Sequence, residues 1–200
     1  MTRNRFFPWL AIIIAGALSA APAIAAEGAK KPTVRLQTSM GDIVLELYPD
    51  KAPLSVDNFL TYVRDGFYNG TVFHRVIANF MIQGGGFTEN LTQKPARNPI
   101  KNEANNGLSN TRGTLAMART ADPHSASAQF FINTVDNNFL DYRADTTRGF
   151  GYAVFGKVVS GMDTVDKIRN TPTGGKGPFP NDVPAVSVII KKATVESDKK

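Results

Sequence analysis

The sequence of 200 residues contains no cysteine and only two histidines, His74 and His124. Without cysteine the chain can form no disulfide, no thiolate metal site and no thiol nucleophile. The two histidines lie far apart and outside an H-E-x-x-H spacing, so the sequence does not predict a histidine-based metal site. We therefore expect neither a bound metal nor another cofactor, and any activity must rely on other side chains.

The rest of the composition is that of a folded domain. Hydrophobic residues make up 42% of the chain and aromatic residues 10%, which is enough for a core, and the length suits one domain. No internal repeat or long linker divides the chain. The net charge of +6 is spread along the sequence and is not gathered with aromatic residues into a basic stripe, so nucleic-acid binding is not expected.

The first twenty-five residues have the pattern of a cleavable leader. Arg3 and Arg5 precede an apolar run at residues 10–18, and small residues follow up to Ala25. A basic start, a short apolar centre and an A-x-A end are typical of a secretory signal peptide, and the run is shorter than the ~20 apolar residues of a spanning helix. We expect residues 1–25 to be a signal peptide cleaved after Ala25. Cleavage would lower the net charge from +6 to +4 and leave no membrane anchor.

Most of the remaining pattern predicts short strands. Residues 34–37 and 43–48 are joined by a polar turn, and in the second run Ile43, Leu45 and Leu47 share one face, as expected of a half-buried hairpin. Further extended runs separated by Gly, Asn and Pro are predicted at residues 71–76, 80–83, 113–117, 129–133, 153–159 and 186–195.

Two segments have a helical period instead. In residues 53–64 the apolar side chains recur at i, i+3, i+4 and i+7, and Pro53 and Gly66 suit the two ends. Met162, Val165 and Ile168 predict a second, shorter helix. Closely spaced strands, two helices and no βαβ alternation predict a mainly β fold, an antiparallel barrel plugged by helices.

Two of the predicted strands carry an amide side chain beside a large apolar group. In residues 80–83, alternation predicts that Phe80 and Ile82 face one way and Met81 and Gln83 the other. An amide beside an apolar group fits a small apolar substituent on a peptide backbone.

The second of these strands repeats the combination. In residues 129–133, Gln129, Phe131 and Asn133 are predicted to share a face. Arg75 adds a cation with five hydrogen-bond donors to the same region of the sequence.

These residues lie in longer motifs that resemble the cyclophilin-type peptidyl-prolyl cis-trans isomerases. The motifs follow in family order from about residue 34 to residue 195: FHRVIANFMIQGGGF, MART, SAQFFIN, FLD and FGYAVFGKVVSGMD. The resemblance is greatest to the exported, periplasmic bacterial branch, in agreement with the leader. It implies a closed eight-stranded antiparallel β-barrel capped by two α-helices, formed by residues 26–200. It also implies an enzyme that accelerates X-Pro bond rotation in exported proteins, with no covalent intermediate.

The resemblance assigns catalytic roles to Arg75, Phe80 and Gln83. It assigns substrate binding to Met81, Ala118, Arg119, Gln129, Phe131, Phe139, Leu140 and Tyr152. Phe139, Tyr152 and Arg119 stand where the best-known eukaryotic members have Trp, His and Asn. The resemblance therefore implies at most weak cyclosporin binding.

Rotation about an amide breaks no σ bond, so this activity would need no nucleophile, metal or proton carrier. That agrees with the scarcity of cysteine and histidine.

The alternative is a chaperone-like binding module for extended proline-containing segments, and the presence of Arg75 and Gln83 favours the enzyme. A carbohydrate-binding barrel is disfavoured because the only tryptophan, Trp9, lies in the leader. We expect a periplasmic monomer whose partners are proline-containing polypeptides, and a structural role for His74.

Overall fold

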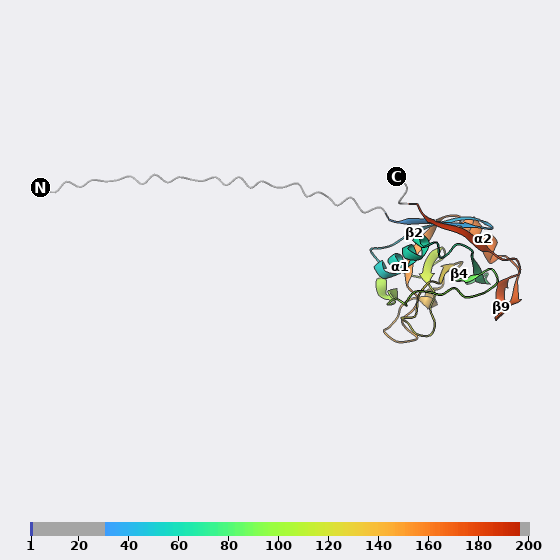
Figure 1. Cartoon of the computed structure of the whole chain (residues 1–200). Helices are drawn as coiled ribbons and strands as arrows, with labels where there is room; N and C mark the ends of the chain where they lie inside the picture. The colour runs from blue at the N-terminus through green and yellow to red at the C-terminus, as the bar shows by residue number, and fades with distance from the viewer. Residues whose placement is uncertain (2–30, 197–200) are drawn as a thin grey trace.

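The computed structural model describes residue 1 and residues 31–196 (Figure 1). Apart from residue 1, the expected signal peptide and its cleavage site after Ala25 lie outside the described residues. Eight strands form a closed barrel in the order β1-β10-β3-β4-β6-β5-β7-β2, and each neighbouring pair is antiparallel. The strands are β1 (Thr33–Thr38), β2 (Gly41–Leu47), β3 (Thr71–Ile77), β4 (Met81–Thr88), β5 (Thr114–Met117), β6 (Phe130–Asn133), β7 (Val154–Ser160) and β10 (Ile189–Val195). The predicted fold class is confirmed.

Two α-helices accompany the barrel, α1 (Pro53–Arg64) and α2 (Met162–Arg169), at the places where the sequence predicts them. Short 3-10 turns lie at η1 (Ala104–Asn106) and η2 (Asn138–Leu140). None of the helices in the described part of the chain is long and apolar enough to cross a membrane.

Side chains from the strands and both helices fill the barrel in one core. Phe59 of α1 is fully buried, and its ring lies 5.2 Å from Tyr68, 5.4 Å from Phe130 and 5.3 Å from Phe155 between ring centroids. Alternation along β2 follows the prediction, since Ile43 and Leu45 are completely buried. This packing makes the barrel a rigid support for residues on its outer surface.

The start of α1 is capped by a residue far away in the sequence. Ala52 precedes the helix and has no side chain that can cap it. Glu103 supplies the missing acceptor: its carboxylate accepts hydrogen bonds from the backbone N–H groups of Leu54 at 2.9 Å and Ser55 at 2.8 Å, and from the Ser55 hydroxyl at 2.7 Å. An anion at this end also opposes the positive end of the helix dipole.

A two-stranded hairpin, β8 (Thr173–Lys176) and β9 (Phe179–Pro184), lies outside the barrel and was not predicted. Figure 1 shows it projecting at the side of the barrel. Its glycines and prolines are weak strand formers, so local pattern does not reveal it. Val183 and Phe179 pack against Val72 of β3, and this tertiary contact accounts for the hairpin.

The largest differences from the predicted strand boundaries are in β10 and β4. β10 begins at Ile189 and not at Val186, whose side chain is exposed. β4 begins at Met81 and extends to Thr88, so Phe80 lies in the turn before it, where its N–H donates to the carbonyl of Ile77 at 3.0 Å.

Candidate functional site

The strands β4 and β6 carry different side chains on their two faces. Ile82 and Ile132 point into the barrel core, whereas Met81 and Phe131 belong to a separate apolar cluster on the outside. The alternation predicted from the sequence is thus confirmed for Met81 and Ile82 in β4 and for Phe131 and Ile132 in β6. It places a second, smaller apolar surface outside the barrel.

The register of the strands brings three predicted site residues side by side. Arg75 of β3 lies opposite Gln83 of β4, and Gln83 lies opposite Phe131 of β6. Side chains of directly paired residues project from the same face of a sheet. A cation, an amide and an aromatic ring therefore form one row across three strands.

A cavity of about 100 Å³ opens beside this row. Its lining contains nine residues: Arg75, Phe80, Met81, Gln83, Ala118, Arg119, Phe131, Leu140 and Tyr152. The structure therefore brings together nine of the eleven predicted site residues in one cavity; Gln129 and Phe139 lie next to it.

Phe80 reaches this cavity by a route that differs from the prediction. Strand alternation placed it on the same face as Ile82, away from Met81 and Gln83. That prediction is wrong because Phe80 belongs to the turn before β4 and does not follow the pleat of the strand. Its ring instead lines the cavity together with Met81 and Gln83.

Arg75 is half-exposed, with a side-chain exposure of 42%. The Arg75 Nε atom lies 3.9 Å from Oδ2 of Asp182, and the guanidinium carbon lies 5.8 Å from the centre of the Phe80 ring. Asp182 belongs to β9, the hairpin that the sequence did not predict. The arginine is therefore contacted by a carboxylate and by an aromatic ring of the cavity.

The two glutamines are joined directly. Gln83 Nε2 donates to Gln129 Oε1 at 2.9 Å. Both line a second cavity of about 240 Å³ that continues from the first. The remaining residues of this second cavity are Gln93, Ala118, Arg119, Thr120, Ser125 and Ser127. The first cavity is mainly apolar in its side chains and the second is mainly polar.

Arg119 lies at the junction of the two cavities and contributes to both. Its Nε donates to the carbonyl of Gly151 at 2.9 Å, and its Nη1 donates to the carbonyl of Thr120 at 2.9 Å. The guanidinium carbon lies 4.5 Å from the centre of the Tyr152 ring, within the range of a cation–π contact.

Phe139 lies on the rim of the first cavity. Its side chain is 62% exposed, and its ring stacks on Phe80 with centroids 5.7 Å apart. It does not contribute to the cavity lining. The neighbouring Leu140 of η2 is buried and does line the cavity.

Buried asparagines, for which the sequence predicts no role in the site, hold this part of the site in place. Asn137 Nδ2 donates to Asn133 Oδ1 at 2.7 Å and to the carbonyl of Phe80 at 2.8 Å. Asn133 Nδ2 donates in turn to Asn110 Oδ1 at 3.2 Å. The network ties the Phe80 turn to the segment that carries Leu140. A single Asn residue carries no sequence signal of such a contact.

His74 precedes Arg75 on β3 and points away from the cavity. It is buried between Phe87 and Phe179, with ring centroids 4.6 Å and 5.5 Å away. Burial lowers the pKa of His74 from 6.5 to about 4, so the imidazole is neutral at pH 7. This environment is that of a core histidine.

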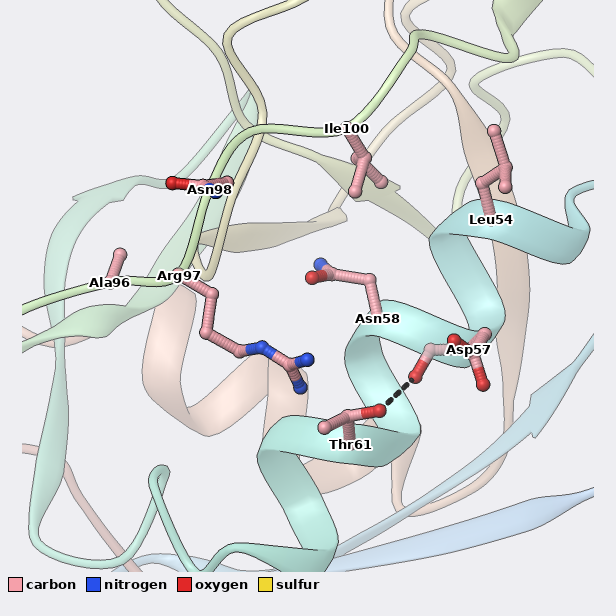
Figure 2. Close-up of a pocket in the computed structure, with 8 residues that line it drawn as sticks. All are labelled: Leu54, Asp57, Asn58, Thr61, Ala96, Arg97, Asn98 and Ile100. Carbon is pink, nitrogen blue, oxygen red and sulfur yellow. Dashed lines mark hydrogen bonds between the residues drawn. The ribbon is translucent and has the colours of Figure 1, made fainter.

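A larger cavity, of about 480 Å³, lies elsewhere, between α1 and the segment that contains Arg97 (Figure 2). Figure 2 shows the Arg97 side chain extending toward α1, where Asp57 and Thr61 also line the space. It contains none of the predicted site residues and no aromatic side chain. Within residues 31–196 we find no group of three or more His, Asp or Glu side chains that could hold a metal ion.

Comparisons with known proteins agree on one family. The sequence model described as "Cyclophilin type peptidyl-prolyl cis-trans isomerase/CLD" matches residues 33–195. Peptidyl-prolyl cis-trans isomerase B of Escherichia coli (strain K12) is 60% identical over 162 residues, which cover 81% of this chain and 98% of that protein. A peptidyl-prolyl cis-trans isomerase of Acinetobacter baylyi is 54% identical over 189 residues, covering 94% of this chain and 95% of that one.

Solved structures show the same relationship. A cyclophilin-type peptidyl-prolyl cis-trans isomerase of Cryptosporidium parvum, crystallised in the presence of the dipeptide Ala-Pro, superposes with a TM-score of 0.69 at 30% identity. The match covers 83% of this chain and 99% of that structure.

Proposed function

Because the chain belongs to the cyclophilin-type peptidyl-prolyl cis-trans isomerase family, we propose that it isomerises X-Pro bonds of exported polypeptides in the periplasm. The isomerase activity follows from the family and from relatives that are 54% to 60% identical. The observation that carries the assignment to specific residues is the position of the Arg75 guanidinium at a small apolar cavity.

The reaction requires the enzyme to stabilise a twisted amide. The X-Pro bond interconverts across a barrier of about 18–20 kcal/mol, which reflects lost amide resonance. In the twisted state the imide nitrogen regains a lone pair that accepts a hydrogen bond. Arg75 donates to this nitrogen, and the interaction lowers the barrier because neither planar form offers the lone pair.

The other cavity residues hold the substrate on either side of the rotating bond. Met81, Phe131 and Leu140 are buried, and their apolar surface accepts the pyrrolidine ring. Gln83 and Gln129, joined by their own hydrogen bond, lie where backbone groups of an extended peptide would pass. With the ring held and the backbone bonded, rotation is confined to the bond before proline.

Replacing Arg75 tests this assignment. Arg75→Ala should lower kcat/KM by about a hundredfold to a thousandfold, the usual effect of losing one positioned donor. The matched control is Arg97→Ala, which removes an arginine from the larger cavity beside α1. Isomerisation is measured by NMR exchange on a short proline peptide. Unchanged activity in Arg75→Ala would refute the role given to this residue.

A second role, holding extended proline-containing segments, is favoured by one observation. The Phe139 ring is 62% exposed on the rim and stacks on Phe80, which extends the apolar surface beyond the cavity. If this role exists, Arg75→Ala should still suppress aggregation of an unfolded client while isomerisation is lost. If Arg75→Ala lost both isomerisation and the suppression of aggregation, the separate holding role would be refuted and only the isomerase role would remain.

The periplasmic location is supported by the basic, apolar and A-x-A pattern of residues 1–25. Export predicts that the protein recovered from the periplasmic fraction begins at Ala26, which N-terminal mass spectrometry would detect. Recovery of the chain from the cytoplasm with its first residues intact would contradict this proposal.

A further inference from the structure

Arg119 is fixed in position at the junction of the two cavities. Two backbone carbonyls, of Gly151 and Thr120, accept from its Nε and Nη1, and the Tyr152 ring lies against its guanidinium. A third carbonyl, of Ala121, lies 3.4 Å from Nη1. These contacts leave Nη2 without a hydrogen-bond partner among residues 31–196. A guanidinium held in this way loses little conformational freedom when it binds a further acceptor.

The charge of Arg119 is not balanced locally. Within residues 31–196 no acidic side chain forms an ion pair with it, whereas Arg75, the other cation of the groove that the two cavities form together, faces Asp182. The remaining lining of the second cavity consists of uncharged side chains, four of them with hydroxyl or amide groups apart from the two joined glutamines. The Asp122 side chain in the adjacent loop accepts instead from the backbone of His124 at 2.9 Å. The second cavity is therefore polar and carries the positive charge of Arg119, which no acidic side chain of the described part of the chain pairs.

The two cavities are placed to receive alternate side chains of one peptide. They share Gln83, Ala118 and Arg119. In an extended peptide, side chains two residues apart point to the same side and are about 7 Å apart. When the proline ring occupies the apolar cavity, the side chain two residues away faces the polar one.

We propose that Arg119 makes the groove prefer substrates with an acidic side chain two residues from the proline. The inference rests on the proposed binding of proline in the apolar cavity. A Glu or Asp carboxylate there would accept from Nη2 of Arg119 in a charge-assisted hydrogen bond. The Gln93 amide and the Ser127 hydroxyl of the second cavity would donate to its other oxygen, whereas the hydroxyls of Thr120 and Ser125 already donate to Ser125 Oγ and to the Asp122 carbonyl.

The test compares peptides that differ only at this residue. Blocked peptides of the form Ala-Xaa-Ala-Pro-Ala and Ala-Pro-Ala-Xaa-Ala are used, with Xaa as Glu, Gln or Lys. For each, kcat/KM of the purified protein is measured by NMR exchange, which needs no coupling protease. In one of the two series, kcat/KM for the Glu peptide should exceed that for the Gln peptide by about threefold to tenfold, and kcat/KM for the Lys peptide should be lower than that for the Gln peptide.

The variant Arg119→Gln should bring the Glu-to-Gln ratio to within about twofold of unity. The control Arg97→Gln, which removes the same charge outside the groove, should leave the ratio unchanged. In the wild-type protein the ratio should also shrink in 0.5 M NaCl, a result that does not depend on how well any variant folds.

Equal rates for Glu and Gln peptides in both series would overturn the proposal, as would a preference that survives Arg119→Gln. Turnover of the Gln peptides reports the isomerase activity itself. A failure of the proposed function would appear as no turnover of any peptide, and is thereby distinguished from a failure of this inference.

Discussion

The carboxylate of Asp182 meets Arg75 at its Nε atom, with 3.9 Å between Nε and Oδ2. Asp182 has a backbone φ of 64°, a left-handed conformation that few residues other than glycine adopt. It belongs to the β8–β9 hairpin, which packs against β3 outside the barrel. The hairpin thus brings a carboxylate to the arginine at the cavity.

Removing this carboxylate should weaken catalysis more than binding. Asp182→Asn tolerates the left-handed backbone but abolishes the charge that restrains the guanidinium. We expect kcat to fall about twofold to fivefold, with KM little changed, as for the loss of a partly exposed ion pair. Asn181→Ala, an exposed neighbour on the same strand, is the control. In an Arg75→Ala background, Asp182→Asn should have no further effect; an additive loss would argue against coupling through Arg75.

Gly86 tests the position of the Gln129 amide. A Cβ atom on Gly86 would lie 2.5 Å from Gln129 Cγ and 2.7 Å from its Nε2, so Gly86→Ala must displace this side chain. We expect kcat/KM to fall about threefold to tenfold through the lost amide hydrogen bonds. At Gly174 a Cβ would have no atom within 4 Å, so Gly174→Ala is the matched control. Wild-type activity in Gly86→Ala would show that Gln129 has no part in binding.

Glu103 should stabilise the fold without affecting the site directly. Glu103→Gln replaces one carboxylate oxygen by an NH₂ group that faces the N–H donors of α1. We expect the free energy of unfolding to fall by about 1–2 kcal/mol, the range for loss of a helix cap. Urea denaturation measures the change, and the m-value should stay the same. The exposed Glu89→Gln is the control, and equal stability of the two variants would contradict the capping role.

His74 should make stability depend on pH. Its folded-state pKa of about 4 lies below the ordinary value of 6.5, so the unfolded chain binds the proton more readily. Stability is therefore unaffected above pH 6.5 and falls as the pH drops toward 4, by about 3 kcal/mol in total.

The variant His74→Phe separates this effect from the titration of carboxylates. It places an apolar ring beside Phe87 and Phe179 and removes the titrating group. Between pH 6.5 and pH 4 it should lose about 3 kcal/mol less stability than the wild type in urea denaturation. Parallel pH profiles for the two proteins would exclude His74 as the source.

The site residues differ in how far the sequence could predict them. Met81, Gln83 and Phe131 follow from strand alternation, because the side-chain period of a strand is independent of its partners. Phe80 does not, since one residue of difference in the start of β4 removes it from the pleat. Asp182 and Asn137 were not predicted as parts of the site at all, because Arg75 and Phe80, which they contact, are distant in the sequence and a single polar residue carries no periodic signal.

The sequence by itself determined the β-rich class, the two helices, the faces of the barrel strands and, through its long motifs, the family. These features depend on local periodicity and on runs of adjacent residues. Only the tertiary structure decided that Glu103 caps α1, that the β8–β9 hairpin brings Asp182 to Arg75, and that Arg119 lies at the junction of two cavities. Each of these joins groups that are separated along the chain, and their geometry exists only once the barrel has closed.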